Sequence, residues 1–162
     1  YEGELLANLV SGYRARYQAH YLDPEPFPGV IELLQDLHRA SIPLATATSK
    51  QAPMALAQME HLGLSEVFDL IAGATPDPAS SKATVIREAL TLLEARGVDT
   101  SHPVIIGDSI WDVRGAQEAG IPVIGVGWGY ATEDGLDEAD AVCETVEELR
   151  SFILDGVARH AR

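Results

Sequence analysis

A nine-residue stretch, VIIGDSIWD at positions 104–112, limits the fold of this chain more than any other feature. It consists of a short apolar run, a glycine, and two carboxylates, Asp108 and Asp112. A continuous apolar run of this length is typical of a parallel strand buried on both faces. Such a strand ends at the carboxyl edge of its sheet, where open α/β proteins bind their ligands. A carboxylate there suits a hard cation such as Mg²⁺, although an aspartate that only caps the next helix would look the same.

Composition indicates one globular domain and restricts its partners. The chain has 162 residues, 25 of them acidic and 11 basic, with a formal net charge of −14. This charge argues against nucleic acid and an anionic membrane surface as partners, but not against a small anionic substrate. No apolar run reaches membrane-spanning length and no signal peptide opens the chain, so we expect no membrane partner. The single cysteine, Cys143, favours a reducing, cytoplasmic location, and we expect it to be a buried core residue rather than a nucleophile.

From residue 26 onward, strands and helices alternate along the chain. We expect strands at 42–48, 67–72, 103–107, 121–126 and 139–143, and helices at 28–40, 51–61, about 81–95, 111–119 and 146–154. Glycine follows several of these helices, as is common at helix ends. The alternation predicts an α/β fold, a Rossmann-like parallel sheet with helices on both faces and right-handed connections.

The N-terminal part has a different pattern. Residues 3–22 are expected to form a helix, because apolar residues recur at helical spacing, namely Leu5, Leu6, Leu9, Val10, Tyr13 and Tyr17. Three prolines within residues 23–29 then make a stiff, extended connector. We therefore expect two units, residues 1–25 and residues 26–162.

Two other expected strands also end in groups suited to an anion. Thr48 and Ser49 lie where the first strand turns into a helix, so they could hold a phosphate oxygen or simply cap that helix. Lys82 begins the helix after the second strand, although the helix dipole disfavours a cation there. Unless it is a solvated surface residue, such a lysine indicates an anionic ligand or a carboxylate cluster nearby.

This order of hydroxyl, lysine and acidic pair resembles the haloacid dehalogenase superfamily of phosphohydrolases. Thr48 matches the hydroxyl of that family's second motif, Lys82 matches the lysine of its third, and residues 107–112 match its fourth, G-D-x-x-x-D. The flanks are similar too. FPGV at 27–30 resembles the return from a helical cap into the core, so residues 1–25 would be the end of that cap. GVGWGY at 125–130 resembles the phosphoglycolate-phosphatase-like branch.

The resemblance implies a Mg²⁺-dependent phosphatase of small phosphorylated metabolites. Thr48, with Ser49 beside it, would hydrogen-bond the phosphoryl group of the substrate, and Lys82 would neutralise its oxygens. Asp108 would bind Mg²⁺, directly or through water, and Asp112 would support that site and orient Lys82 or a metal-bound water. Catalysis would depend on positioning and charge neutralisation.

One motif of the family is missing. Its first motif, D-x-D-x-T, supplies the aspartate nucleophile and ends a strand that lies between those ending at Thr48 and Asp108. No Asp-x-Asp precedes Thr48. We therefore expect this chain alone to be inactive. The absent strand would leave two interior sheet edges facing a slot, and each buried unpaired backbone group costs about 1–3 kcal/mol. We expect a missing N-terminal segment or a partner strand to fill it.

Two alternatives to a phosphatase follow from the same residues. The chain could be a non-catalytic module that binds phosphate and Mg²⁺, or half of a split protein that binds a partner chain. A response-regulator receiver also uses aspartates, a threonine and a lysine at strand ends. Its phosphorylated aspartate precedes the threonine, whereas Asp108 follows both Thr48 and Lys82, which argues against a receiver.

Overall fold

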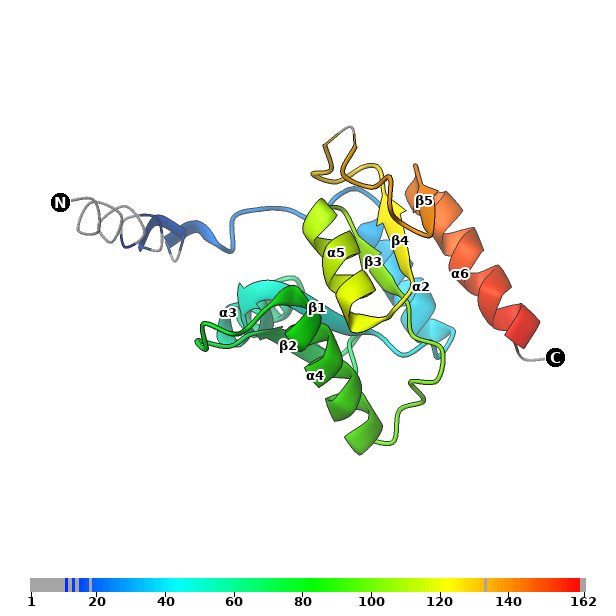
Figure 1. The fold of residues 1–162 in the computed structure, drawn as a ribbon, viewed down its shortest axis with the longest axis horizontal. Coiled ribbons are helices and arrows are strands. Elements are labelled where there is room, and N and C mark those ends of the chain that lie inside the picture. Colours follow the sequence, from blue (N-terminus) through cyan, green and yellow to red (C-terminus); the bar gives the residue numbers. More distant parts are fainter. Residues whose placement is uncertain (1–10, 12, 14, 18, 133, 161–162) are drawn as a thin grey trace.

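The computed structural model describes residues 11–160 except residues 12, 14, 18 and 133 (Figure 1). In chain order its elements are α2 (Val30–Arg39), β1 (Ala45–Gln51), α3 (Ala52–His61), β2 (Leu70–Ala74), α4 (Lys82–Ala95), β3 (Ile105–Gly107), α5 (Ile110–Ala119), β4 (Val123–Val126), β5 (Ala141–Cys143) and α6 (Val146–His160). Every strand and helix expected beyond residue 26 is therefore present. The α/β class is confirmed.

The expected N-terminal helix is only partly covered. Its apolar residues Leu5, Leu6, Leu9 and Val10 lie outside the described residues. Those residues between 11 and 20 that the structure describes are helical, and the rings of Tyr13 and Tyr17 stack with centroids 6.1 Å apart. In Figure 1 this segment projects from the rest of the molecule. The division into residues 1–25 and 26–162 stays a prediction.

The strands form two parallel sheets rather than one. β1 pairs with β2 in one sheet, and the order in the other is β3, β4, β5. Thr48 lies opposite Gly73 in the first ladder, and Gly107 lies opposite Gly125 in the second. Within the described part of the chain, no ladder joins β1 to β3. The sheet is thus divided between the strands ending near Thr48 and Asp108, where the sequence predicted a slot.

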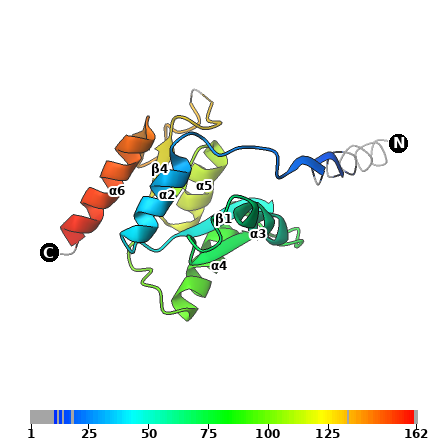
Figure 2. The same ribbon diagram turned by 180° about the vertical axis from the view of Figure 1, so that it is seen from behind.

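Helices cover both faces of the three-stranded sheet. On one face, Leu33 and Leu37 of α2 and Leu149 of α6 pack against Ile124 and its neighbours in β4 and β5. On the other face, Val113 and Ala116 of α5 pack around Val123. Figures 1 and 2, drawn from opposite sides, show α5 in front of this sheet in one view and α2 in front in the other. The expected covering of both faces is confirmed.

A pair of adjacent helices connects the two sheets. α4 packs against β1 and β2, with Ala89 and Leu93 against Leu70. α4 also packs along α5, which covers β3 and β4. The strands on either side of the division therefore share one helical layer. None of the described helices has the length and hydropathy needed to cross a membrane.

Candidate active site

Asp112 is the centre of the polar network at the carboxyl end of β3. Its carboxylate atom Oδ2 accepts hydrogen bonds from the backbone N–H of Asp108 at 3.2 Å and from the backbone N–H and the Oγ of Ser109 at 3.1 and 2.7 Å. Its other oxygen, Oδ1, lies 2.7 Å from Nζ of Lys82. Both oxygens of Asp112 are therefore occupied by partners from the protein, and Asp112 is the one buried charged residue in the described part of the chain.

Local sequence explains how Asp112 reaches this place. Ser109 is the N-cap of α5, and Asp112 stands three residues later, so the two form a reciprocal capping box. A carboxylate in the first turn of a helix also interacts favourably with the helix dipole. The network therefore begins with a helix start that the sequence could encode by itself.

Lys82 stands at the first position of α4, after the N-cap Ser81. Its side chain is 18% exposed and that of Asp112 is 12% exposed. The dipole of α4 disfavours the ammonium, whereas the carboxylate of Asp112 on the neighbouring helix stabilises it. The structure thus contains the carboxylate partner that the sequence indicated. An ammonium has three N–H donors, and this ion pair leaves two of them for an anion.

Asp108 follows β3 and lies against the loop after β4. Its Oδ2 accepts a hydrogen bond of 3.1 Å from the backbone N–H of Tyr130. Its Oδ1 accepts none from any residue that the structure describes. The Tyr130 ring, which is 81% exposed, contacts Phe27 of the proline-rich connector at a centroid distance of 5.5 Å. The sequence singled out this loop, GVGWGY at 125–130, through its resemblance to the family, but it assigned no role to Tyr130, whose contact with Asp108 depends on the fold.

Thr48 and Ser49 lie within β1 rather than at the start of α3. Regular pairing with β2 ends at Thr48, and the register shifts before Gln51, which is the N-cap of α3. Neither residue caps the helix. The Thr48 Oγ1 accepts a hydrogen bond of 3.2 Å from the backbone N–H of Lys50, and its own proton has no acceptor among the described residues. This hydroxyl can therefore donate to a ligand.

The structure joins Lys82, Asp112 and Asp108 in one network, whereas Thr48 has no hydrogen bond to it. The fold places Thr48 near the carboxyl end of β1, and α4, which packs on β1, begins at the same edge because it follows the parallel strand β2. The roles predicted for Thr48, Ser49, Lys82, Asp108 and Asp112 stay predictions.

The donors do not complete a magnesium site. Mg²⁺ prefers near-octahedral oxygen ligands. Asp108 has one free carboxylate oxygen, and both oxygens of Asp112 are already occupied. Among the described residues, no three His, Cys, Asp or Glu side chains are grouped to hold a metal ion. Asp108 can therefore supply one ligand, and this part of the chain lacks the others.

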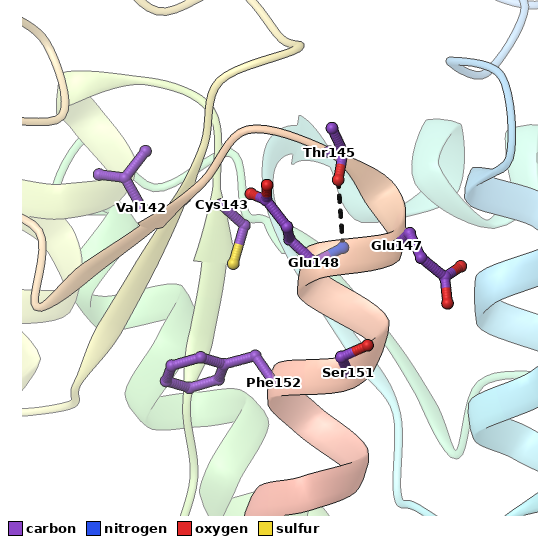
Figure 3. Close-up of a pocket in the computed structure, with 7 residues that line it drawn as sticks. All are labelled: Val142, Cys143, Thr145, Glu147, Glu148, Ser151 and Phe152. Carbon is purple, nitrogen blue, oxygen red and sulfur yellow. Dashed lines mark hydrogen bonds between the residues drawn. The ribbon is translucent and has the colours of Figure 1, made fainter.

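A separate pocket lies between β5 and α6 (Figure 3). Its lining residues are Val142, Cys143, Thr145, Glu147, Glu148, Ser151 and Phe152. The lining includes two carboxylates and no cation, so the pocket does not suit a phosphate ester. None of the predicted site residues line it.

Cys143 in this pocket is expected to be unreactive. Burial raises the pKa of its thiol, and the carboxylates of Glu148 and Glu144 raise it further. The thiolate is the reactive form, so a raised pKa means a smaller reactive fraction at pH 7 to 8 than in free cysteine. Alkylation with iodoacetamide, followed by mass spectrometry, should proceed roughly tenfold more slowly than with free cysteine. A rate equal to that of free cysteine would contradict the expected role as a buried core residue.

Comparison with known proteins decides the family. A family model described as haloacid dehalogenase-like hydrolase matches residues 2–126. The chain belongs to this family. The haloacid dehalogenase-like assignment confirms the resemblance carried by Thr48, Lys82 and the G-D-x-x-x-D residues.

Individual relatives agree with the haloacid dehalogenase-like assignment. The tyrosine-protein kinase PtkA of Mycobacterium tuberculosis strain H37Rv is 36% identical over 157 residues, which cover 93% of this chain and 53% of PtkA. A phosphoglycolate phosphatase of Caulobacter vibrioides is 35% identical over 133 residues, covering 82% of this chain and 55% of that enzyme. A haloacid dehalogenase-like hydrolase of Streptococcus pneumoniae superposes with a TM-score of 0.81 at 29% identity, covering 93% of this chain and 70% of its own. The chain spans about half the length of the two curated relatives.

Proposed function

We propose that this chain forms the phosphate-binding part of a phosphatase that hydrolyses small phosphorylated metabolites. The observation that carries the proposal is the ion pair of Lys82 with Asp112 beside Asp108, at the carboxyl end of a parallel strand. This edge is where α/β proteins bind their ligands. The similarity to phosphoglycolate phosphatases supports a small phosphate ester as the substrate class.

Lys82 would contribute by neutralising charge. The reaction breaks the ester P–O bond, transfers the oxygen of water to phosphorus and returns a proton to the leaving oxygen. Negative charge is spread over the phosphoryl oxygens as this happens. The two free N–H donors of Lys82 would hold these oxygens, and the proton of the Thr48 hydroxyl would be donated to a third, with Ser49 beside it. Because Asp112 already holds the ammonium in place, little reorganisation is required during the reaction.

The proposal includes Mg²⁺ and a cytoplasmic location, each with its own support. Asp108 has one carboxylate oxygen free to act as a ligand, and the remaining ligands would come from outside the described residues. The family's first motif would supply further carboxylates. A single cysteine, which permits no internal disulfide, fits a reducing compartment.

We also propose that an extended segment of polypeptide lies between β1 and β3. Neither strand has a second ladder partner within the described part of the chain. Val104 and Ile106, on the β3 side of the division, are 42% and 39% exposed, although residues of this kind are normally buried in a parallel sheet. The segment would be apolar and parallel to both strands, and its carboxyl end would carry carboxylates near Lys82.

The test of the phosphatase proposal uses the longest polypeptide encoded with this chain. It should release phosphate from p-nitrophenyl phosphate, and Lys82→Met should lower kcat/KM by about a hundredfold or more, because one preorganised charge is lost. Asp108→Asn should abolish either the activity or its dependence on added Mg²⁺. Unchanged rates in both variants would refute the assignment of these residues.

Arg87→Met provides the matched control. Arg87 lies on the same helix as Lys82, and its half-exposed side chain contacts Glu118 of α5 through an ion pair at 3.9 Å and a hydrogen bond to the Glu118 backbone carbonyl. The substitution removes the same charge without touching the site, so kcat/KM should change less than twofold. If Arg87→Met lowers the activity as much as Lys82→Met, the loss reflects α4 as a whole and not the ammonium of Lys82.

The similarity to PtkA makes phosphoryl transfer to tyrosine a second candidate. Both reactions need the phosphoryl-binding groups, and they differ in the acceptor. Incubation with labelled ATP and a tyrosine-containing peptide separates them, because label appears on the peptide in a transfer and as inorganic phosphate in a hydrolysis. Absence of both activities, with phosphate binding retained, would favour the non-catalytic module.

A further inference from the structure

Gly115 occupies an unusual place in α5. It lies in the interior of the helix and is buried, although glycine is among the poorest helix formers. The polar network that contains Lys82 lies directly beside it. A side chain at this position would add helix propensity, so the glycine requires another explanation.

The contacts around Gly115 supply one. A Cβ atom built at position 115 would lie 2.4 Å from Cγ of Lys82 and 2.7 Å from its Cβ. Real Cβ atoms essentially never approach other atoms within 3.0 Å. The aliphatic part of Lys82 therefore passes through the space that a side chain at position 115 would fill. This path takes the ammonium to Asp112, one turn before Gly115 in the same helix.

The same relation recurs at the other two charged residues of the network. A Cβ at Gly107 would lie 2.2 Å from Cβ of Asp112, and one at Gly129 would lie 2.2 Å from Cβ of Asp108. Each charged side chain thus lies against a glycine of a neighbouring segment. Gly115 is the most informative of the three, because its contact with Lys82 links α5 to α4, two helices that are far apart in the sequence.

We propose that Gly115 is a positioning residue that determines where the ammonium of Lys82 lies. It leaves open the path by which Lys82 crosses from α4 to the carboxylate of Asp112. Because Cβ of Lys82 moves only with the backbone, a side chain here displaces the lysine together with the start of α4 and separates the ion pair, even where both helices remain folded. This inference rests on the proposed function for its chemical meaning, but the geometry can be tested without substrate.

The test exploits the two lysines of the chain, Lys50 and Lys82. Limited acetylation with an N-hydroxysuccinimide ester, followed by peptide mass spectrometry, gives the labelling rate of Lys82 relative to the exposed Lys50. In Gly115→Ala the relative rate should rise about fivefold, because Lys82 loses its carboxylate partner and becomes exposed. Gly156→Ala is the control, since Gly156 is also in a helix and a Cβ there meets nothing within 4 Å.

A second measurement separates positioning from a general loosening of the helix pair. Asp112→Ala should shift the urea midpoint less in the Gly115→Ala background than in the unmodified chain or in Gly156→Ala, because the ion pair is already broken and only the capping hydrogen bonds of Asp112 remain to be lost. An equal shift in all three backgrounds, or an unchanged labelling ratio in folded Gly115→Ala, would overturn the proposal.

If Gly115→Ala does not fold, a second substitution, Lys82→Gly, tests whether the clash with Lys82 is the cause. Lys82→Gly removes the atoms that a side chain at position 115 would meet, so the double variant should fold and Gly115→Ala alone should not. Lys82→Gly alone is the control, because it also removes the ion-pair partner of the buried Asp112. If Lys82→Gly folds and the double variant does not, Gly115 is needed for another reason and the proposal is overturned. If the unmodified protein shows no phosphatase activity but Lys82 is labelled faster in Gly115→Ala as expected, only the proposed function is refuted.

Discussion

Asp112→Ala is expected to lower the free energy of unfolding by about 3 kcal/mol. The substitution removes the carboxylate that holds Lys82, so a largely buried ammonium loses its partner. It also leaves the N–H groups of Asp108 and Ser109 without their acceptor and removes half of a capping box. Urea denaturation followed by circular dichroism would measure the loss, which is a large part of the usual ~5–15 kcal/mol stability of a domain.

Asp155→Ala is the control for this measurement. Asp155 is also a helical aspartate, but it is exposed and makes no hydrogen bond or ion pair with any described residue. Its replacement should change the free energy of unfolding by less than about 0.5 kcal/mol. A similarly small effect for Asp112→Ala would show that the network around Asp112 does not stabilise the fold.

The second large effect is expected from a peptide added in trans. A peptide with four apolar residues followed by Asp-x-Asp-x-Thr should bind between β1 and β3 and complete one continuous sheet. It would satisfy backbone groups on both edges and cover Ile106. At a hundredfold excess over its Kd, the peptide should stabilise the fold by about 2.7 kcal/mol. For a chain of this size the corresponding rise in Tm is roughly 8 °C, measurable by differential scanning fluorimetry.

A proline variant of the peptide provides the control. Proline in the centre of the strand removes an N–H donor from the ladder, so this peptide should stabilise the chain far less. Equal stabilisation by both peptides would indicate non-specific apolar binding and would refute the strand proposal. Stabilisation without any phosphate release would support the split-protein module instead of the phosphatase.

Several element boundaries followed from local sequence and are confirmed by the structure. Ser81 caps α4, which runs from Lys82 to Ala95 close to the expected 81–95, and Gly120 ends α5 with φ of +75°. These features depend on residues within a few positions of one another, so a single sequence contains the information that determines them.

Other boundaries depend on distant residues, and there the predictions were wrong. β1 was expected to end at Thr48 but continues to Gln51. The added residues of β1 pass close to Gly73 of β2. A Cβ at position 73 would lie 2.5 Å from the carbonyl oxygen of Lys50, so β1 can approach β2 this closely only because residue 73 is glycine. α6 was expected to end at Leu154 but continues to His160, through Gly156. A glycine in a helix lowers its propensity without ending it.

In the candidate site, too, some features follow from local sequence and others depend on distant residues. The capping box of Ser109 and Asp112 has members only three residues apart, so a local pattern encodes it, although Asp108 and not Ser109 was the residue considered as the cap. The hydrogen bond from Tyr130 to Asp108 was missed, since the two residues are 22 positions apart and no local pattern connects them. The role of Gly115 was equally invisible, because a helical glycine acquires meaning only from the lysine stem that crosses it.

The sequence by itself determined the α/β class, the order of the elements, the family and the charged residues of the candidate site. These follow from periodicity and from motifs within single strand-to-helix turns, which are local properties of a chain. Only the tertiary structure decided that Asp112 forms an ion pair with Lys82, that Asp108 keeps one free oxygen, and that the sheet is divided beside β3. Those outcomes arise from the packing of α4 on α5 and from unsatisfied strand edges, and both depend on which distant segments meet.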